Sequence, residues 1–223
     1  MKLYLSLLTT MFCFLSCKQS EKQNTEPVKE LTVAEKIAEA HGINHWNKVT
    51  ELTFTFNVDK NSTHYDRTWI WKPKTNQVTA ISKTETITYL RAEVDSLSQR
   101  ADQGFINDKF WLLPAFQLVW DSGTSISEPV KVQAPISKKD LNKITLLYTG
   151  DGGYTPGDAY DIYYNDDFLI EEWIFRQKNN PEPSMTTAFG DYKTINNITF
   201  PTSSTKAEGN WKLHFTNLEV KTE

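Results

Sequence analysis

Residues 52–58 read Leu-Thr-Phe-Thr-Phe-Asn-Val, so that apolar and polar side chains alternate without a break. Successive side chains of a β-strand point to opposite faces of a sheet, and this period of two therefore predicts a half-buried strand with one polar face. A turn at residues 60–62 and a second strand over 64–72 follow, and after another turn come strands over 77–82 and 84–90. This meander of short antiparallel strands favours an open or closed β-barrel over a fold of alternating strands and helices.

The second half of the chain returns to the same period of two after a helical interruption. The alternation predicts about eleven strands in the whole chain. The strands expected in its second half lie over residues 130–134, 141–149, 159–164, 168–176, 185–194, 198–205 and 210–221. In the last of these strands, the apolar residues of 211–215 lie at odd-numbered positions and those of 218–220 lie at even-numbered positions. A regular strand would therefore place the two groups on opposite faces of the sheet. A bulge near Thr216 and Asn217 would bring both groups to one face of the sheet.

A helix is expected before the first strand. Thr32 and Glu35 have the spacing of a capping box, in which each side chain accepts the other residue's backbone N–H. The residues through His41 are good helix formers, and Gly42 is a natural left-handed stop. The sequence therefore predicts a helix from Thr32 to His41.

The helical interruption is expected to contain two segments. Residues 92–104 form a polar helical stretch, and Asn107 can cap a second short helix through Leu113. Pro114 then ends this helix or restarts it. Apolar residues are dense from Phe110 onward, which indicates that this part of the insert is buried.

Composition and charge fit one globular domain over residues 31–223. The 223 residues carry a formal charge of −4, with acidic and basic side chains interspersed along the chain. Binding to nucleic-acid phosphates depends on clustered Lys and Arg, so no nucleic acid is expected as a partner. Hydrophobic residues make up 39% of the chain and aromatic residues 13%, which is enough for a substantial core.

The sequence has no pattern typical of a catalytic or metal site. We find no nucleophile elbow, no phosphate-binding loop and no pair of catalytic carboxylates, so we expect a non-catalytic protein without a cofactor. His41 and His45 are four residues apart, but Gly42 between them ends the helix that would bring both to one face. The acidic residues of 151–167 lack the spacing of a calcium loop, and turn formation explains them. We therefore expect no metal.

The first residues have the layout of a secretory signal peptide over residues 1–16. Lys2 precedes an uncharged apolar run that is too short to span a bilayer, and Ser16 follows as a small residue. Cys17 comes directly after it, which resembles the lipobox of bacterial lipoproteins, where the cysteine becomes the acylated first residue of the mature chain. The alternative is an ordinary cleaved signal peptide that happens to contain cysteines.

The lipobox resemblance implies that Cys17 anchors the chain to a membrane through attached acyl chains. Residues 17–30 are then the acylated cysteine and a hydrophilic, disordered tether. Lys18 differs from the acidic residue that retains some lipoproteins in the inner membrane. The expected location is therefore the outer membrane, with the periplasmic or the surface leaflet left open.

Four stretches resemble the LolA/LolB type of lipoprotein-localisation domain and a family of uncharacterised Gram-negative lipoproteins with that fold. They are Trp-Ile-Trp-Lys-Pro-Lys-Thr-Asn-Gln-Val (69–78), Phe-Trp-Leu-Leu-Pro-Ala-Phe (110–116), Asp-Ile-Tyr-Tyr-Asn-Asp-Asp-Phe-Leu-Ile (161–170) and Asp-Tyr-Lys-Thr-Ile-Asn-Asn-Ile-Thr-Phe-Pro (191–201). The resemblance implies an α+β fold in which a curved antiparallel sheet, an unclosed β-barrel, wraps over one to three helices. It also implies that acyl chains are held in the apolar concavity of the sheet.

Aromatic residues on the expected strands and in the helical insert are the candidate ligand-binding residues. They are Phe54, Phe56, Trp69, Trp71, Trp111 and Trp173, which could line a cavity for lipid. Arg67 has the parity of Trp69 and Trp71 and could meet an anionic headgroup or a carboxylate at the cavity edge. Residues 110–116 could plug or gate the cavity. The alternative is that these aromatic side chains form an ordinary packed core.

The expected function is therefore binding of a hydrophobic ligand by a membrane-anchored envelope lipoprotein. The ligand would be acyl chains or a lipidated protein, while the oligomeric state stays open. A structural lipoprotein with a filled core that binds an envelope protein is the alternative, and an envelope hydrolase or glycan-binding module is a third possibility. An empty apolar cavity would distinguish the first function from the second.

Overall fold

The computed structural model describes residues 30–150 and 154–223. The predicted signal peptide, Cys17 and the predicted tether up to residue 29 lie outside the described residues. The chain divides into two units after Glu30, and all the helices and strands described here belong to the second unit.

The first helix, α1 (Val33–Ala40), begins as its sequence predicts. The backbone N–H of Thr32 donates to Glu35 Oε2 at 2.7 Å, and the backbone N–H of Glu35 donates to Thr32 Oγ1 at 3.2 Å. Gly42 follows the helix with a φ of 87°, in the left-handed region. A Cβ atom at this position would also lie 2.0 Å from the carbonyl oxygen of Asn197, so only glycine fits here. The predicted helix and its stop are confirmed.

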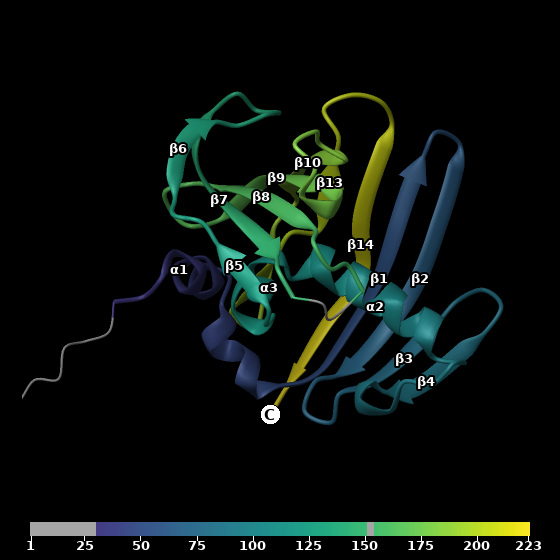
Figure 1. The fold of residues 1–223 in the computed structure, drawn as a ribbon. Coiled ribbons are helices and arrows are strands. Elements are labelled where there is room, and N and C mark those ends of the chain that lie inside the picture. Colours follow the sequence, from purple (N-terminus) through teal and green to yellow (C-terminus); the bar gives the residue numbers. More distant parts are fainter. Residues whose placement is uncertain (1–29, 151–153) are drawn as a thin grey trace, which may run out of the picture. The chain divides into compact units, whose positions relative to one another are not determined.

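One twelve-stranded antiparallel sheet dominates the described chain (Figure 1). Its strands have the order β4-β3-β2-β1-β14-β13-β10-β9-β8-β7-β5, with β6 also paired to β7, and β11 and β12 form a separate hairpin. The outermost strands do not pair with each other, so the predicted α+β fold with an unclosed curved sheet is confirmed. The strand bounds are β1 (Val49–Lys60), β2 (Thr63–Lys72), β3 (Gln77–Ile81), β4 (Thr86–Leu90), β5 (Thr124–Ile126), β6 (Val130–Gln133), β7 (Asp140–Tyr148), β8 (Ala159–Tyr164), β9 (Ile170–Arg176), β10 (Met185–Gly190), β11 (Lys193–Ile195), β12 (Ile198–Phe200), β13 (Ser203–Thr205) and β14 (Trp211–Thr222).

The described chain has more strands than the alternation predicts. β5 is only three residues long and gives no clear alternation. The strands predicted over 185–194 and 198–205 are each divided in two. The first breaks at Asp191, whose φ is 51°, and the second breaks at Pro201, which has no backbone N–H to donate to a neighbouring strand. Because of these breaks, β12 leaves the main sheet and places Phe200 in the core.

The predicted bulge in β14 is confirmed. Thr55 of β1 pairs with Thr216, whereas Thr53 pairs with Glu219, so two residues of β14 lie opposite one residue of β1. Asn217 has a φ of 50° at this irregularity. The extra residue shifts the alternation, and the apolar side chains on both sides of Asn217 are buried on the same face.

The helical insert contains one long helix, α2 (Gln99–Leu112), and a short helix, α3 (Pro114–Trp120), which Pro114 opens. The predicted helix start at Asn107 is wrong, because α2 runs through this position. The Asn107 side chain donates to Asp108 Oδ1 at 2.9 Å and caps nothing. Asp108 and Lys109 are both buried on the inner face of α2. These two charged residues interrupt the apolar periodicity of the sequence, although the helix continues through them.

The chain before α2 is less helical than its sequence indicates. Residues 92–104 are predicted as one helical stretch, whereas the structure has a 3₁₀ helix, η2 (Arg91–Glu93), and then a turn. Asp95 closes this turn, because its carboxylate accepts the backbone N–H of Leu97 at 3.1 Å and of Ser98 at 2.9 Å. Two further 3₁₀ helices are η1 (Ile43–Lys48) and η3 (Gln177–Asn179).

The contacts of α2 show how strongly the sheet curves. Phe105 packs against Trp69 of β2 with ring centroids 5.6 Å apart, and Phe110 packs against Trp173 of β9 at 5.4 Å. In a flat sheet, the order of the strands would place β2 and β9 about 24 Å apart, at about 4.8 Å per strand. Phe105 and Phe110 are only about 7.5 Å apart along the helix axis. The sheet therefore wraps around α2, which crosses its concave side (Figure 1).

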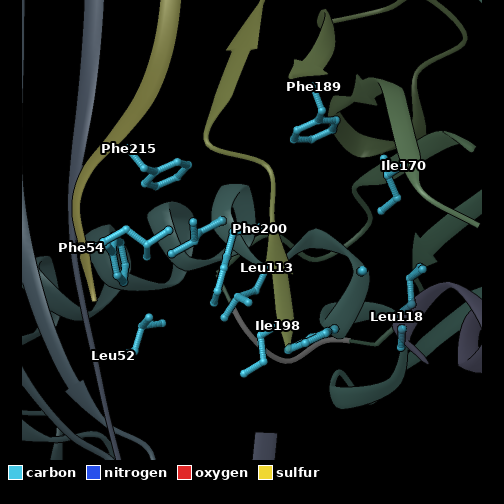
Figure 2. Packing of buried hydrophobic residues seen from close by; sticks show 14 of the residues in the cluster. Leu52, Phe54, Leu113, Leu118, Ile170, Phe189, Ile198, Phe200 and Phe215 are labelled. Carbon is cyan, nitrogen blue, oxygen red and sulfur yellow. The ribbon is translucent and has the colours of Figure 1, made fainter. Parts of the chain in front are cut away.

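A packed core fills the space beside α2. Phe54 of β1 faces Phe215 of β14 with ring centroids 5.9 Å apart. Leu113, between α2 and α3, lies next to Ile198 and Phe200 of β12 (Figure 2). The small hairpin therefore contributes apolar side chains to the interior although it is outside the main sheet.

Candidate functional site

A cavity of about 770 Å³ lies between α2 and the strands that curve around it. Small-molecule sites in proteins have volumes of roughly 300–1,000 Å³ and are lined mainly by apolar side chains. The walls come from α2, α3, β1 and β14 and from β7 to β10. The apolar and aromatic side chains of its lining are Phe56, Val58, Ile106, Phe110, Trp111, Trp120, Tyr148, Tyr154, Tyr160, Trp173, Phe175, Met185, Trp211 and Leu213.

Trp173 of β9 holds one wall of this cavity in place. Its ring centroid lies 5.4 Å from that of Phe110, 4.4 Å from that of Trp111 and 5.2 Å from that of Tyr160. Its indole N–H is buried and has no acceptor among residues 30–150 and 154–223. Because the rings contact one another on several sides, they form a rigid apolar surface before any ligand arrives.

The predicted aromatic site residues fall into two groups. Those that line the cavity are Phe56, Trp111 and Trp173. Those that lie in the packed core are Phe54, Trp69 and Trp71, with 0%, 1% and 6% of their surface exposed. Phe56 and Trp173 belong to the same buried core cluster, so these two side chains pack in the core and also face the cavity.

Residues 110–116, which could plug or gate the cavity, lie partly in the cavity lining and partly in the core. Phe110 and Trp111 line the cavity from the last turn of α2. Leu112, Leu113 and Phe116 are buried in the core beside it. The segment forms the end of α2 and the start of α3.

Arg67 of β2 is occupied by a partner within the fold. Its Nε donates to Asp108 Oδ2 at 2.5 Å and its Nη2 donates to Asp108 Oδ1 at 2.6 Å. Burial alone would lower the pKa of Arg67, but the hydrogen bonds and the charge of Asp108 raise it. The guanidinium also lies against Gly104 of α2, where a Cβ would be 2.7 Å from Nη1. The structure thus gives Arg67 an internal carboxylate and does not place it in the cavity lining.

Lys109 is, with Arg91, one of two cationic residues among the described residues of the cavity lining. It lies on the inner face of α2, lines the cavity and has 7% of its surface exposed. Its Nζ donates to Gln117 Oε1 at 3.1 Å and lies 5.7 Å and 5.5 Å from the ring centroids of Trp71 and Trp120. No carboxylate of residues 30–150 and 154–223 forms an ion pair with it. Burial lowers the pKa of Lys109 to about 8.

The other charged groups of the cavity have fixed partners. Asp121 Oδ2 accepts the hydroxyl of Tyr148 at 2.5 Å. Asp158 Oδ1 accepts the backbone N–H of Lys178 at 2.8 Å. Arg91 donates to Asp102 Oδ1 at 2.9 Å, and the same carboxylate accepts the hydroxyl of Tyr154 at 2.8 Å. Burial raises the pKa values of Tyr148 and Tyr160, so both hydroxyls stay protonated at neutral pH.

Two features of the sequence around Lys109 indicate a buried lysine. It is followed by the apolar run Phe110 to Leu113, and it lies four residues after Phe105, on the same helix face. A lysine on the apolar face of a helix is unusual, because lysine is rarely buried without a charged partner. The sequence-based prediction starts a new helix at Asn107, so it assigns Phe105 and Lys109 to different segments. Their shared helix face is therefore not recognised from the sequence.

A second hollow, of about 870 Å³, lies beside the first turn of α1. Its lining includes residues 31–36, the end of α3 and parts of β5, β7 and β8, and none of its charged side chains is buried. The described residues also contain no group of three or more His, Cys, Asp or Glu side chains placed to hold a metal ion. None of the helices in the described part of the chain is long and apolar enough to cross a membrane.

No protein-family model matches this sequence, and no curated protein matches it significantly. Solved structures with a similar fold include a LolA superfamily protein from Nitrosomonas europaea, with 12% identity, a TM-score of 0.48, and coverage of 86% of this chain and 93% of that chain. A DUF1329 family protein from Desulfovibrio piger has 10% identity, a TM-score of 0.44, and coverage of 84% and 90%. An outer membrane lipoprotein-sorting protein domain from Vibrio parahaemolyticus has 11% identity, a TM-score of 0.43, and coverage of 85% and 94%. The LolA family that the sequence resembles is thus among these neighbours.

Proposed function

We propose that this protein is an envelope lipoprotein that binds a hydrophobic ligand, acyl chains or a lipidated protein, in the cavity around α2, and that it catalyses no reaction on this ligand. The observation that carries the proposal is the cavity of about 770 Å³ with its mostly apolar and aromatic lining. A structural lipoprotein with a filled core would have no need for such a space. Apolar pockets with few polar groups are typical of sites for apolar ligands.

The energy for binding would come from burial of methylene groups. Each CH₂ removed from water contributes about 0.8 kcal/mol, so ten methylenes contribute about 8 kcal/mol before the cost of association. The rings around Trp173 already contact one another, so little side-chain ordering would oppose binding. Because association itself costs about 4–15 kcal/mol, long acyl chains should bind more tightly than short ones.

The second part of the proposal is that Cys17 carries the acyl anchor and the outer membrane is the location. A hydrophilic tether of this length has an average reach of roughly 20 Å. The cavity would then stay close to the membrane that supplies or receives the ligand. Mass spectrometry of the intact chain and of its Cys17→Ser variant tests this part, because acylation at Cys17 adds a lipid mass that the variant lacks.

Native mass spectrometry of the purified chain tests the binding proposal. All samples carry Cys17→Ser, so that the chain brings no acyl group of its own. We expect a co-purifying fatty acid or phospholipid in this background. Val58→Trp and Met185→Trp fill the cavity from two sides and should remove the bound lipid. Val130→Trp is the matched control, because Val130 is exposed on β6 and outside the cavity lining.

The result that contradicts the proposal is a protein without lipid that stays without lipid after incubation with fatty acids and phospholipid vesicles. The same holds if the cavity-filling variants keep their lipid while circular dichroism shows the fold to be intact. In either case the envelope protein partner of the alternative function becomes the next target.

A further inference from the structure

We propose that the ligand of this cavity is a long-chain carboxylate, and that the ammonium group of Lys109 binds its carboxylate head. This inference rests on the proposed function and adds the chemical class of the ligand and the residue that selects it. The acyl chain would lie along the aromatic wall around Trp173, and the head would lie at the junction of α2 and α3.

Lys109 carries its positive charge in a largely buried position. Transfer of an ammonium group from water to the protein interior is costly unless an anion accompanies it. Lys109 is 7% exposed, and among residues 30–150 and 154–223 no Asp or Glu forms an ion pair with it. By contrast, the part-buried Arg67, Arg91 and Arg176 each have a carboxylate partner. Lys109 is therefore a buried cation at the cavity wall with no ion-pair partner among the described residues, and the carboxylates of Asp121 and Asp102 act on it only from beyond ion-pair distance.

The ammonium group of Lys109 has unused hydrogen-bonding capacity. An ammonium group has three N–H donors. Gln117 Oε1 accepts one of them at 3.1 Å, and Gln117 is itself held by a hydrogen bond from its Nε2 to the carbonyl of Leu113 at 3.3 Å. The aromatic rings of Trp71 and Trp120 lie within cation–π distance but accept no conventional hydrogen bond. At least one donor is thus left for a ligand in the cavity.

The position of Lys109 is fixed by its neighbours. Asp108, the preceding residue on α2, is held by Arg67 and by the indole N–H of Trp69 at 2.8 Å. This contact sets the rotation of α2 about its axis. Gln117 and Trp120 reach the same place from α3. A group held from two helices in this way is preorganised for recognition.

The charges of the cavity lining favour a carboxylate over a phosphate. A phosphate monoester carries about −1.5 to −2 charges at neutral pH, whereas a carboxylate carries one. Lys109 is a single cation, and Arg91, the other cation of the lining, is paired with Asp102. Asp121 and Asp158 also lie in the lining and disfavour additional negative charge. One positive charge in this setting matches one carboxylate.

Isothermal titration calorimetry with three probes tests this inference. The probes are laurate, lauryl alcohol and lauryl phosphate, which share one alkyl chain and differ in the head. The protein is the full chain with Cys17→Ser, as wild type at position 109 and as Lys109→Met. Lys131→Met serves as the matched control, because Lys131 is exposed on β6 and lies outside the cavity lining.

We expect wild-type protein to bind laurate about 10- to 100-fold more tightly than lauryl alcohol, which is the range of a hydrogen bond to a charged group. Lys109→Met should lose this preference and keep its affinity for lauryl alcohol, whereas Lys131→Met should retain both. Equal binding of laurate and lauryl alcohol by the wild type, or a preference that survives in Lys109→Met, overturns the role of Lys109 and leaves the proposed function intact. Tighter binding of lauryl phosphate than of laurate overturns the choice of a carboxylate. If no probe binds, the proposed function itself fails.

Discussion

The guanidinium of Arg67 on β2 and the carboxylate of Asp108 on α2 form a two-point ion pair on the concave side of the sheet. Nε and Oδ2 are 2.5 Å apart, Nη2 and Oδ1 are 2.6 Å apart, and the Asp108 side chain has no exposed surface. Trp69 donates its indole N–H to the same carboxylate at 2.8 Å. The pair therefore fixes α2 against the sheet and determines which residue of the helix faces the cavity.

Replacement of Asp108 by leucine should destabilise the protein strongly. The variant leaves the part-buried guanidinium of Arg67 without its anion and the Trp69 N–H without its acceptor. Removal of one partner of a buried pair costs about 3–5 kcal/mol. Urea unfolding of the variant against wild type measures this loss as a lower midpoint with an unchanged slope.

A double variant, Arg67→Met with Asp108→Leu, provides the control for this prediction. It removes both charges, so the loss should be much smaller than the sum of the two single losses. Lys221→Met removes an exposed ion pair with Glu51 and should change the midpoint little. Additive losses in the double variant would show that Arg67 and Asp108 do not act as a pair.

A second prediction concerns His41, whose ring is buried at the end of α1. Burial lowers its pKa from 6.5 to about 4, and Nδ1 contacts the carbonyl oxygen of Ile37 at 2.9 Å. Between these two pH values the unfolded chain binds a proton that the folded protein does not. Stability is therefore lost as the pH falls from about 6.5 to about 4, by about 3 kcal/mol from this residue.

The measurement is urea unfolding of wild type and of His41→Leu at several pH values between 7 and 4. All other titrating groups are common to both proteins, so the difference between the two profiles isolates His41. The wild type should lose more stability on acidification than the variant does. Parallel profiles would mean that His41 titrates alike in the folded and unfolded states.

Local signals in the sequence predict much of the fold because their physical causes are local. The capping box of Thr32 and Glu35 depends on residues three apart, and the bulge at Asn217 follows from the change of apolar parity along one strand. The positive φ of Gly42 is visible as a helix stop. Its contact with Asn197 is not visible, because the two residues are brought together only by the docking of the β11–β12 hairpin.

The candidate site could be predicted only in part for the same reason. Parity places Arg67 on the face of Trp69 and Trp71, and all three are found against α2. The sequence does not show that Asp108 neutralises Arg67, since the pair joins residues 41 positions apart. Lys109 lies one residue beyond that partner, and its role depends on a tertiary contact that no local pattern contains.

A third prediction separates the two reasons why position 42 requires glycine, which are its positive φ and the close approach of the Asn197 carbonyl. Both Gly42 and Gly209 have positive φ, at 87° and 82°, but a Cβ at Gly209 meets no atom within 4 Å. Gly209→Ala should cost only the backbone strain, about 1 kcal/mol. Gly42→Ala adds the clash with the Asn197 carbonyl and should cost about 2 kcal/mol or more. Equal shifts of the urea midpoint for both variants would refute the role of the close approach.

A fourth prediction is that Lys109→Met stabilises the protein that has no ligand. The folded-state pKa of Lys109, about 8, lies below its ordinary value of 10.5, so the buried charge opposes folding. Methionine has a similar shape and no charge, and at pH 7 its gain should be about 1–3 kcal/mol. As the pH rises from about 8 to 10.5, wild type sheds this proton on folding and its stability should approach that of the variant. A variant less stable than wild type at pH 7 would show that Lys109 is held by interactions stronger than those described.

The last prediction joins the charge of Lys109 to ligand binding. In the part of the chain that the structure describes, the other ionisable side chains around the cavity are Arg91, Asp102, Asp121, Tyr148, Tyr154, Asp158 and Tyr160. Burial raises the pKa values of the three tyrosines, which keeps their hydroxyls protonated at neutral pH. A change of affinity just above neutral pH therefore reports on Lys109.

Laurate should bind the wild type with constant affinity from pH 6.5 to 7.5 and more weakly above about pH 8, by up to about tenfold per pH unit. The sign follows because the head needs a protonated Lys109, and the free protein loses this proton as the pH passes its pKa. Lauryl alcohol has no charge to match, so its affinity should not change with pH. Calorimetric titrations of both probes at pH 7, 8 and 9 measure the difference. A laurate affinity that stays level up to pH 9 would place the carboxylate away from Lys109, because no other described group of the lining would then explain the preference for an anion.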